Sequence, residues 1–346
     1  MPLNLKSLLI GVALLFIVAG ALLYLGPSRK EGQQVVVYTS VDEEYAEPLF
    51  KQFSEKSGIA IVPRYDSEAA KSRQMLERLL QMKDKPDGDV CWNSELSLTQ
   101  VLANSDVLQP YESPSAKDIP GTYKDSQRRW SGFGCRARVI IYNTNLIKRE
   151  DVPRSLDGLA DPRWKGKICV PKPLFGTTLS HFASIYLELG DEKAMRLFRS
   201  WRDNGVEMVE SNSDVRNRVS EGYFAMGLTD TDDALEAIDR KKPVGFIVPD
   251  QSGGWHGAYL VPNTVSILKN CAHLKEAKAF VDFLLRPETE AWLATHGAHQ
   301  IPVRNIPGIE PPIPLEGLKP AHVDVEKLGK EVLNLGDRIN ATLKSK

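Results

Sequence analysis

QVVVYTSVDEEYAEPLFKQFSEKSGIAIVPRYD, residues 34–66, decides the fold class. The stretch opens with an apolar β-type run that stops at small polar residues, and it closes with a second such run over 59–66. Between them, 42–58 has a helical pattern, with Asp42 at the N-cap position and Gly58 as terminator. A strand, a helix and a strand in this order predict a parallel sheet.

Apolar β-type runs and helical patterns keep alternating along the rest of the chain, which indicates a second α/β unit. Further strands are expected at GDVCWN (88–93), ARVIIYN (137–143), KICVPKP (167–173), FAMGLTD, PVGFIVPD and TVSILK (264–269), and a helix is expected at 275–287. The tail beyond Ile306 is rich in proline and then helical. Two α/β units predict two lobes around a cleft.

Polar clusters follow several of these strands. In open α/β sheets, ligands bind beyond the carboxyl ends of the strands. We therefore expect one cleft to be lined by five segments: YTSVDEE (38–44), DVCWNSE (89–95), PLFGTT (173–178), ESNSDV (210–215) and LTDTDD (228–233). Ser40 ends the first strand and is expected to reach this cleft.

The first thirty residues stand apart from the fold. Lys6 precedes an uninterrupted apolar run over 8–25, followed by Gly26, Pro27 and charges. Residues 1–30 are therefore a cleaved signal peptide or a membrane anchor, and both remain open. Either one places the rest in the periplasm or at the outer face of the cell membrane. The net charge of −1 and the lack of a basic stripe argue against nucleic-acid binding.

The four cysteines are far apart and form no C-x-x-C pair, which argues against a zinc site. Export permits a disulfide. Because three of them lie in apolar strand-like stretches, buried free thiols are the favoured interpretation. The four are Cys91, Cys135, Cys169 and Cys271.

Residues 34–305 resemble the ferric-iron-binding, transferrin-like group of periplasmic substrate-binding proteins that supply ABC transporters. The resemblance rests on the opening strand with YTS, on DVCW, and on WSGFGCRARVIIYNTNLI (130–147), LADPRWKGKICVPKP (159–173) and ESNSDVRNRVSEGYFAMGL (210–228), in that order. It implies a type II fold with two lobes and a hinged cleft, and a permease as partner. It also implies the domain limits: 34–140 with 262–305 as the first lobe, 141–261 as the second, and 306–346 packing on a lobe.

In the proteins that this chain resembles, two adjacent tyrosines and a histidine hold Fe³⁺. The tyrosine position reads Thr229-Asp230-Thr231-Asp232-Asp233 here, and Asp42 lies near the histidine position. The resemblance therefore implies carboxylate metal ligands in this chain: Asp42, Glu95, Asp232 and Asp233. It also implies a synergistic anion at the helix start Gly176-Thr177-Thr178, assisted by Asn212.

The residues themselves leave alternatives open at these places. Crowded carboxylates such as Asp230, Asp232 and Asp233 repel one another, so they suit a hard cation or an ammonium group, although a helix cap by Asp232 or Asp233 explains part of the pattern. Strand alternation places Arg136 and Arg138 on one face, where they are candidates for contacts with an anion or between lobes. A solvated or salt-bridged face is the other interpretation. FGTT is either an anion site or an ordinary helix start.

The leading function is the capture of a small ligand, ferric iron or another metal with or without an anion, by lobe closure rather than catalysis. An alternative ligand is a phosphorylated or phosphonate organic solute bound by FGTT and the arginines. A distant alternative is a phosphoaspartyl-type hydrolase, because Asp230-Thr231-Asp232 is a D-x-D after a strand. No cofactor is expected beyond the metal ion.

Overall fold

The computed structural model describes residues 33–66, 73–252 and 255–344. The chain divides into Met1–Gln33 and Gln34–Lys346, and the second unit carries the fold. The predicted signal or anchor at 1–30 lies outside the described residues. Within the described part, no helix has the length and apolar character needed to cross a membrane.

The opening stretch folds as predicted. β1 (Gln34–Thr39) pairs in parallel with β2 (Ala60–Tyr65), and α2 (Glu43–Ser57) connects them. Asp42 takes the N-cap position of α2, and Gly58 ends the helix with a left-handed φ of 73°. β3 (Val90–Asn93), at the strand expected over 88–93, pairs in parallel on the other side of β1.

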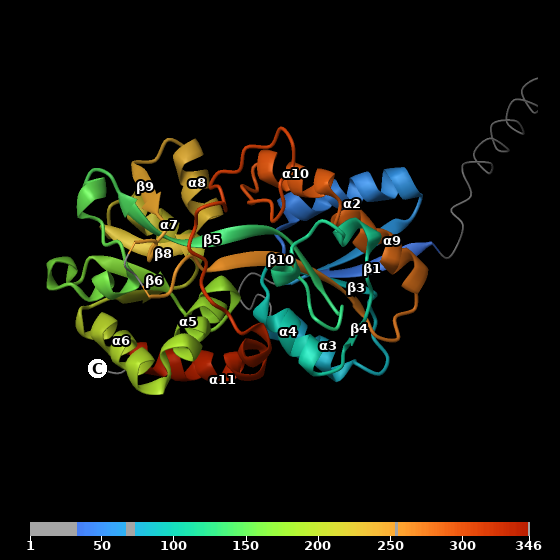
Figure 1. The fold of residues 1–346 in the computed structure, drawn as a ribbon, viewed down its shortest axis with the longest axis horizontal. Coiled ribbons are helices and arrows are strands. Elements are labelled where there is room, and N and C mark those ends of the chain that lie inside the picture. Colours follow the sequence, from blue (N-terminus) through green and yellow to red (C-terminus); the bar gives the residue numbers. More distant parts are fainter. Residues whose placement is uncertain (1–32, 67–72, 253–254, 345–346) are drawn as a thin grey trace, which may run out of the picture. The chain divides into compact units, whose positions relative to one another are not determined.

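β5 (Ser131–Asn143) and β10 (Leu260–Leu268) connect two groups of strands in one sheet. The first part of β5 pairs antiparallel with β10, and its second part pairs with β8 (Met226–Asp230) and β9 (Val244–Ile247). We call the group around β1, β3 and β10 the first lobe, and the group around β8 and β9 the second lobe (Figure 1). β5 begins earlier than the predicted 137–143, because its first six residues belong to the first lobe's sheet.

The remaining strands extend these two groups. The sheet order is β2-β1-β3-β10-β5-β8-β6-β7, with β4 on β10 and β9 on β5. The other strands are β4 (Leu108–Gln109), β6 (Ile168–Pro171) and β7 (Glu207–Val209). The other helices are α3 (Arg73–Gln81), α4 (Ser97–Asn104), α5 (Gly176–Leu189), α6 (Asp191–Asp203), α7 (Asn212–Ser220), α8 (Thr231–Asp239), α9 (Leu274–Leu284), α10 (Pro287–Thr295) and α11 (Val325–Lys344).

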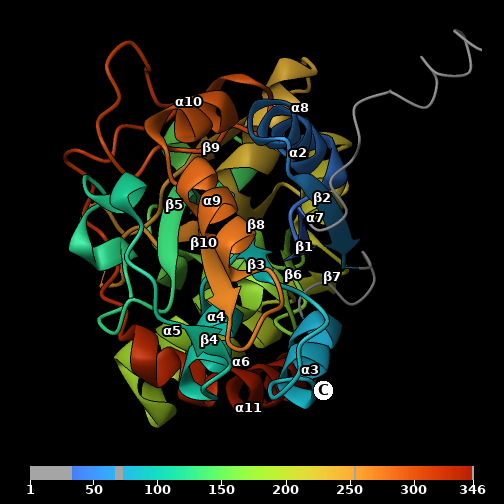
Figure 2. The same ribbon diagram turned by 90° about the vertical axis from the view of Figure 1, so that its right-hand side faces the viewer.

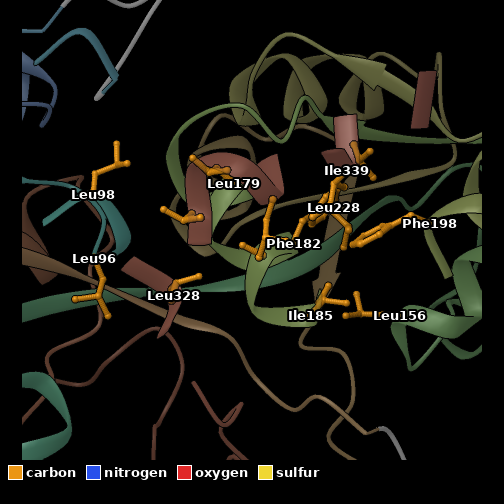
Figure 3. Close-up of a cluster of buried hydrophobic side chains, with 14 of the residues drawn as sticks. Leu96, Leu98, Leu156, Leu179, Phe182, Ile185, Phe198, Leu228, Leu328 and Ile339 are labelled. Atoms are coloured by element: carbon orange, nitrogen blue, oxygen red, sulfur yellow. The ribbon is translucent and has the colours of Figure 1, made fainter. Parts of the chain in front are cut away.

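The C-terminal helix α11 contacts helices of both lobes: α4 in the first, and α5 and α6 in the second. It lies at the foot of Figures 1 and 2. Its apolar side chains recur at helical spacing and join one buried cluster with residues from both lobes, of which Leu98, Leu179, Leu328 and Ile339 are labelled in Figure 3. The tail was expected to pack on one lobe, and the structure instead places it against both.

All four cysteines are free thiols, as favoured from the sequence. Cys91, Cys135 and Cys169 are buried, and burial raises the pKa of the Cys91 thiol to about 12. Trp92 is also buried, and its ring packs against Phe50 and Phe133. It is a packing residue and does not line the cleft.

Candidate functional site

A cleft of about 640 Å³ lies between the lobes, and all five predicted segments contribute to its lining. Ser40, Ser94, Thr177, Asn212 and Asp232 represent one segment each. The volume is in the range of sites that hold small molecules. The expectation of one cleft lined by these strand ends is confirmed.

Carboxylates outnumber cationic side chains in this lining by seven to three. The charged lining residues from the first lobe are all acidic: Asp42, Glu43, Glu44 and Asp66. The second lobe contributes both signs: Lys172, Arg216, Asp232, Asp233 and Glu236, with Arg136 on the connecting strand. The cleft as a whole therefore favours a ligand with positive charge.

The TDTDD stretch joins β8 to α8. Asp230 ends β8 and is the N-cap residue of α8. The interpretation of Asp232 or Asp233 as the helix cap is therefore wrong. Asp232 and Asp233 lie in the first turn of α8 and line the cleft. Carboxylate oxygens of all three aspartates lie within 4.8 Å of one another. The helix dipole favours negative charge at this end but does not remove the mutual repulsion.

Two arginines offset part of this repulsion. Arg136 Nη1 lies 3.4 Å from Asp232 Oδ2, and Arg216 Nη1 lies 3.7 Å from Asp233 Oδ1. Even so, burial raises the pKa of both carboxyl groups, and burial together with the charges of Asp232 and Asp230 raises the pKa of Asp233 to about 7. The two arginines therefore do not fully balance the negative charge of the pair.

Asp230 belongs to a buried network below the cleft rather than to its lining. Its Oδ1 accepts from Arg138 Nη1 at 2.8 Å, and its Oδ2 accepts from the Thr177 hydroxyl at 2.7 Å and from Asn212 Nδ2 at 2.9 Å. Asp230 and Arg138 are both fully buried. The prediction that Asp230 and Arg138 contact the ligand is therefore wrong, because neither residue lines the cleft. A buried, arginine-paired Asp230 also cannot attack a substrate as the hydrolase alternative requires.

Arg136 and Arg138 lie on one face of β5, as strand alternation predicts. Both approach Asp230, with Nη1–carboxylate distances of 3.8 Å and 2.8 Å, whereas Cys135 and Ala137 pack in an apolar cluster of the first lobe. Arg136 lines the cleft, and its Nη2 donates to the carbonyl oxygen of Ser94.

Glu95 does not reach the cleft. It is fully buried, and its carboxylate accepts from the backbone N–H groups of Ser97 and Leu98 at 2.7 Å and from the Ser97 hydroxyl. These donors form the start of α4, whose unpaired N–H groups need such an acceptor. The prediction that Glu95 is a metal ligand is therefore wrong, because its carboxylate caps the start of α4. Burial raises the pKa of this carboxyl group, although the hydrogen bonds act to lower it.

The residues predicted to hold an anion lie at a helix start in the cleft. α5 begins at Gly176, whose φ of 59° suits a residue without a side chain. Gly176, Thr177 and Thr178 all line the cleft, together with Asn212 at the start of α7. The Thr177 hydroxyl, however, donates to Asp230, so only the backbone and Thr178 remain to contact a ligand here.

Of the first-lobe residues predicted for the site, Ser40 and Asp42 line the cleft. The Ser40 hydroxyl donates to Asn93 Oδ1 at 2.7 Å, and Asp42 lies at the exposed start of α2. Sequence reasoning missed Tyr45, which also lines the cleft and whose pKa is raised to about 12 by burial, by Glu44 and by Asp232 on the other lobe. Its position one turn after Asp42 was the available signal.

Arg216 was also missed, although it lies one turn after Asn212 on α7 and lines the same cleft. Among the histidines, His181 is buried beside Tyr259, His296 stacks on Trp292, and His299 lies 3.2 Å from Asp239. None of these three lines the cleft.

Comparison with known proteins places the chain in a family. Residues 97–320 match the bacterial extracellular solute-binding protein model. The Fe(3+)-binding periplasmic protein of Serratia marcescens is 23% identical over 312 residues, covering 88% of this chain and 89% of its own.

Two solved structures share the fold. Apo ferric ion-binding protein A from Pasteurella haemolytica has a TM-score of 0.79 at 23% identity, covering 91% of this chain and 100% of its own. The periplasmic binding protein AfuA from Actinobacillus pleuropneumoniae, with fructose-6-phosphate bound, has a TM-score of 0.75 at 23% identity, covering 87% of this chain and 96% of its own. Members of the matched family are binding proteins. This chain, with its two lobes and polar cleft, belongs to the bacterial extracellular solute-binding protein family.

Proposed function

We propose that the protein captures a hard metal cation in its cleft, with ferric iron as the first candidate, and delivers it to an ABC transporter permease. The observation that carries the proposal is the pair Asp232 and Asp233: both face the cleft, and both have raised pKa values despite Arg136 and Arg216. Carboxylate oxygens are the ligands that hard cations prefer.

Two further features support this ligand class. The first lobe offers Asp42, Glu44 and the Tyr45 phenol across the cleft from the aspartate pair, so closure would surround a cation with oxygen atoms from both lobes. The Serratia marcescens relative is described as Fe(3+)-binding and periplasmic. An accompanying anion would lie at the starts of α5 and α7, where backbone N–H groups favour negative charge.

Closure would occur about β5, the strand that pairs with β10 of the first lobe and with β8 and β9 of the second. On this proposal, 34–140 with 262–305 moves as one lobe and 141–261 as the other. The protein would work in the periplasm or at the outer face of the membrane, held there by 1–30 if that segment is uncleaved. It performs no catalysis, because binding and release are the whole of its task.

The test is metal content. The full chain is purified without chelator, incubated with ferric citrate, passed through a desalting column and analysed for metals. We expect one iron atom per chain. A protein that retains no iron, manganese or other metal after each has been offered would contradict the proposal.

Metal affinity should fall with acidity below neutral pH. Asp233, with a pKa raised to about 7, holds a proton below that pH, and a cation must displace it. Affinity should therefore be nearly constant above pH 7 and fall about tenfold per pH unit below it. Titrations from pH 5 to 8 check this. Asp233→Asn should flatten the profile, and an unchanged slope in that variant would show that another group controls it.

A phosphorylated organic solute remains the second candidate. The starts of α5 and α7 face the cleft beside Lys172 and Arg216. AfuA, whose structure contains bound fructose-6-phosphate, has the same fold as this chain. Calorimetry with a hexose phosphate in metal-free buffer distinguishes the two. Micromolar binding of the sugar phosphate, with no metal retained, would favour this candidate.

A further inference from the structure

Arg136 lies where the two lobes and the aspartate cluster meet. On β5, Arg136 pairs with Val261 of β10 in the first lobe. Arg138, two residues later on the same strand, pairs with Asp230 of β8 in the second lobe. Its guanidinium donates to the Ser94 carbonyl on one side and lies 3.4 Å from Asp232 Oδ2 on the other. One side chain thus connects the β3–α4 loop of the first lobe to the aspartates of the second.

This guanidinium is a permanent positive charge. Arginine keeps its proton in proteins at any physiological pH. Its side chain is only 13% exposed, and its Nε has no hydrogen-bond partner among the described residues. Asp232 therefore already has a cationic partner within the protein, and that partner cannot leave by losing a proton.

We propose that Arg136 is the specificity-determining residue of the cleft: a fixed counter-cation that lowers the affinity for bare cations in proportion to their charge. The inference rests on the proposed capture of a cation. A ligand cation at Asp232 would lie within a few ångströms of the guanidinium, and their repulsion scales with the charge of the ligand. The ligand class that follows is a cation of low net charge: a divalent ion, or a trivalent ion whose charge is reduced by a bound anion.

The experiment compares two ions of similar size and ligand preference but different charge, Ca²⁺ and Tb³⁺, in a buffer without coordinating anions. Affinities of the full chain are measured for the parent protein and for Arg136→Gln, which removes the charge but keeps a polar side chain. Removal of the charge should strengthen binding on the order of tenfold per unit of ligand charge. The gain for Tb³⁺ should therefore exceed the gain for Ca²⁺ by about tenfold.

Arg136→Lys keeps the charge and should restore most of the parent difference between the two ions. Melting curves of both variants establish that they fold. Equal changes for Ca²⁺ and Tb³⁺ in Arg136→Gln, or weaker binding of both, would overturn the inference while leaving cation capture intact. If neither the parent nor the variant binds either ion, the proposed function fails and the inference fails with it.

Discussion

A protein in which Asp232 and Asp233 are both replaced by asparagine is expected to lose at least about a hundredfold of its metal affinity. The two carboxylates supply the negative charge that faces the cleft from the second lobe. Asparagine keeps the size and the carbonyl oxygen but removes both charges. Calorimetry with the metal found by elemental analysis measures the loss.

The same double variant should fold normally and melt at an equal or higher temperature above pH 7. Because the pKa of Asp233 is raised, its charged form costs folding energy there, and a neutral amide removes that cost. Glu55→Gln with Glu77→Gln is the matched control, since both side chains are well exposed and the net charge changes equally. Unchanged metal affinity in the Asp232 and Asp233 variant would reduce the pair to a solvated helix start.

Arg138→Met is expected to destabilise the protein by about 3–5 kcal/mol. The substitution removes the nearer charge partner of the buried Asp230, while Arg136 stays 3.8 Å away and Thr177 and Asn212 still donate to it. Met fills a similar volume, so lost packing contributes little. Urea unfolding monitored by tryptophan fluorescence measures the change.

A double-mutant cycle separates this charge effect from general damage. Asp230→Asn combined with Arg138→Met removes both charges, so its cost should be well below the sum of the single costs. Arg163→Met is a control, because its pair with Asp161 is largely exposed and should be worth less than about 1 kcal/mol. A cost for Arg138→Met as small as that control would mean that water or another group stabilises Asp230.

The local parts of the fold could be predicted, because neighbours in sequence determine them. The alternation in 34–66 was sufficient for β1, α2 and β2, with Gly58 marking the helix end. The length of β5 could not be predicted, because Gly132 and Gly134 interrupt its apolar pattern and its partner β10 is distant in sequence. Tertiary pairing decides such strands.

The site was predictable at the level of segments and less so at the level of single residues. All five segments reach the cleft, yet Glu95 turns inward because the start of α4 follows it immediately. The pairing of Arg138 with Asp230 depends on the register of β5 against β8, which sequence does not reveal. A carboxylate at a strand end is thus ambiguous until its nearest donors are known.

The position of α11 has a consequence for how the protein unfolds. Two lobes connected only through β5 and β10 could each unfold independently of the other. Here the buried face of α11 belongs to one apolar cluster with α4 of one lobe and α5 and α6 of the other. Unfolding of either lobe would expose that face to water, so we expect the two lobes to unfold as a single cooperative unit.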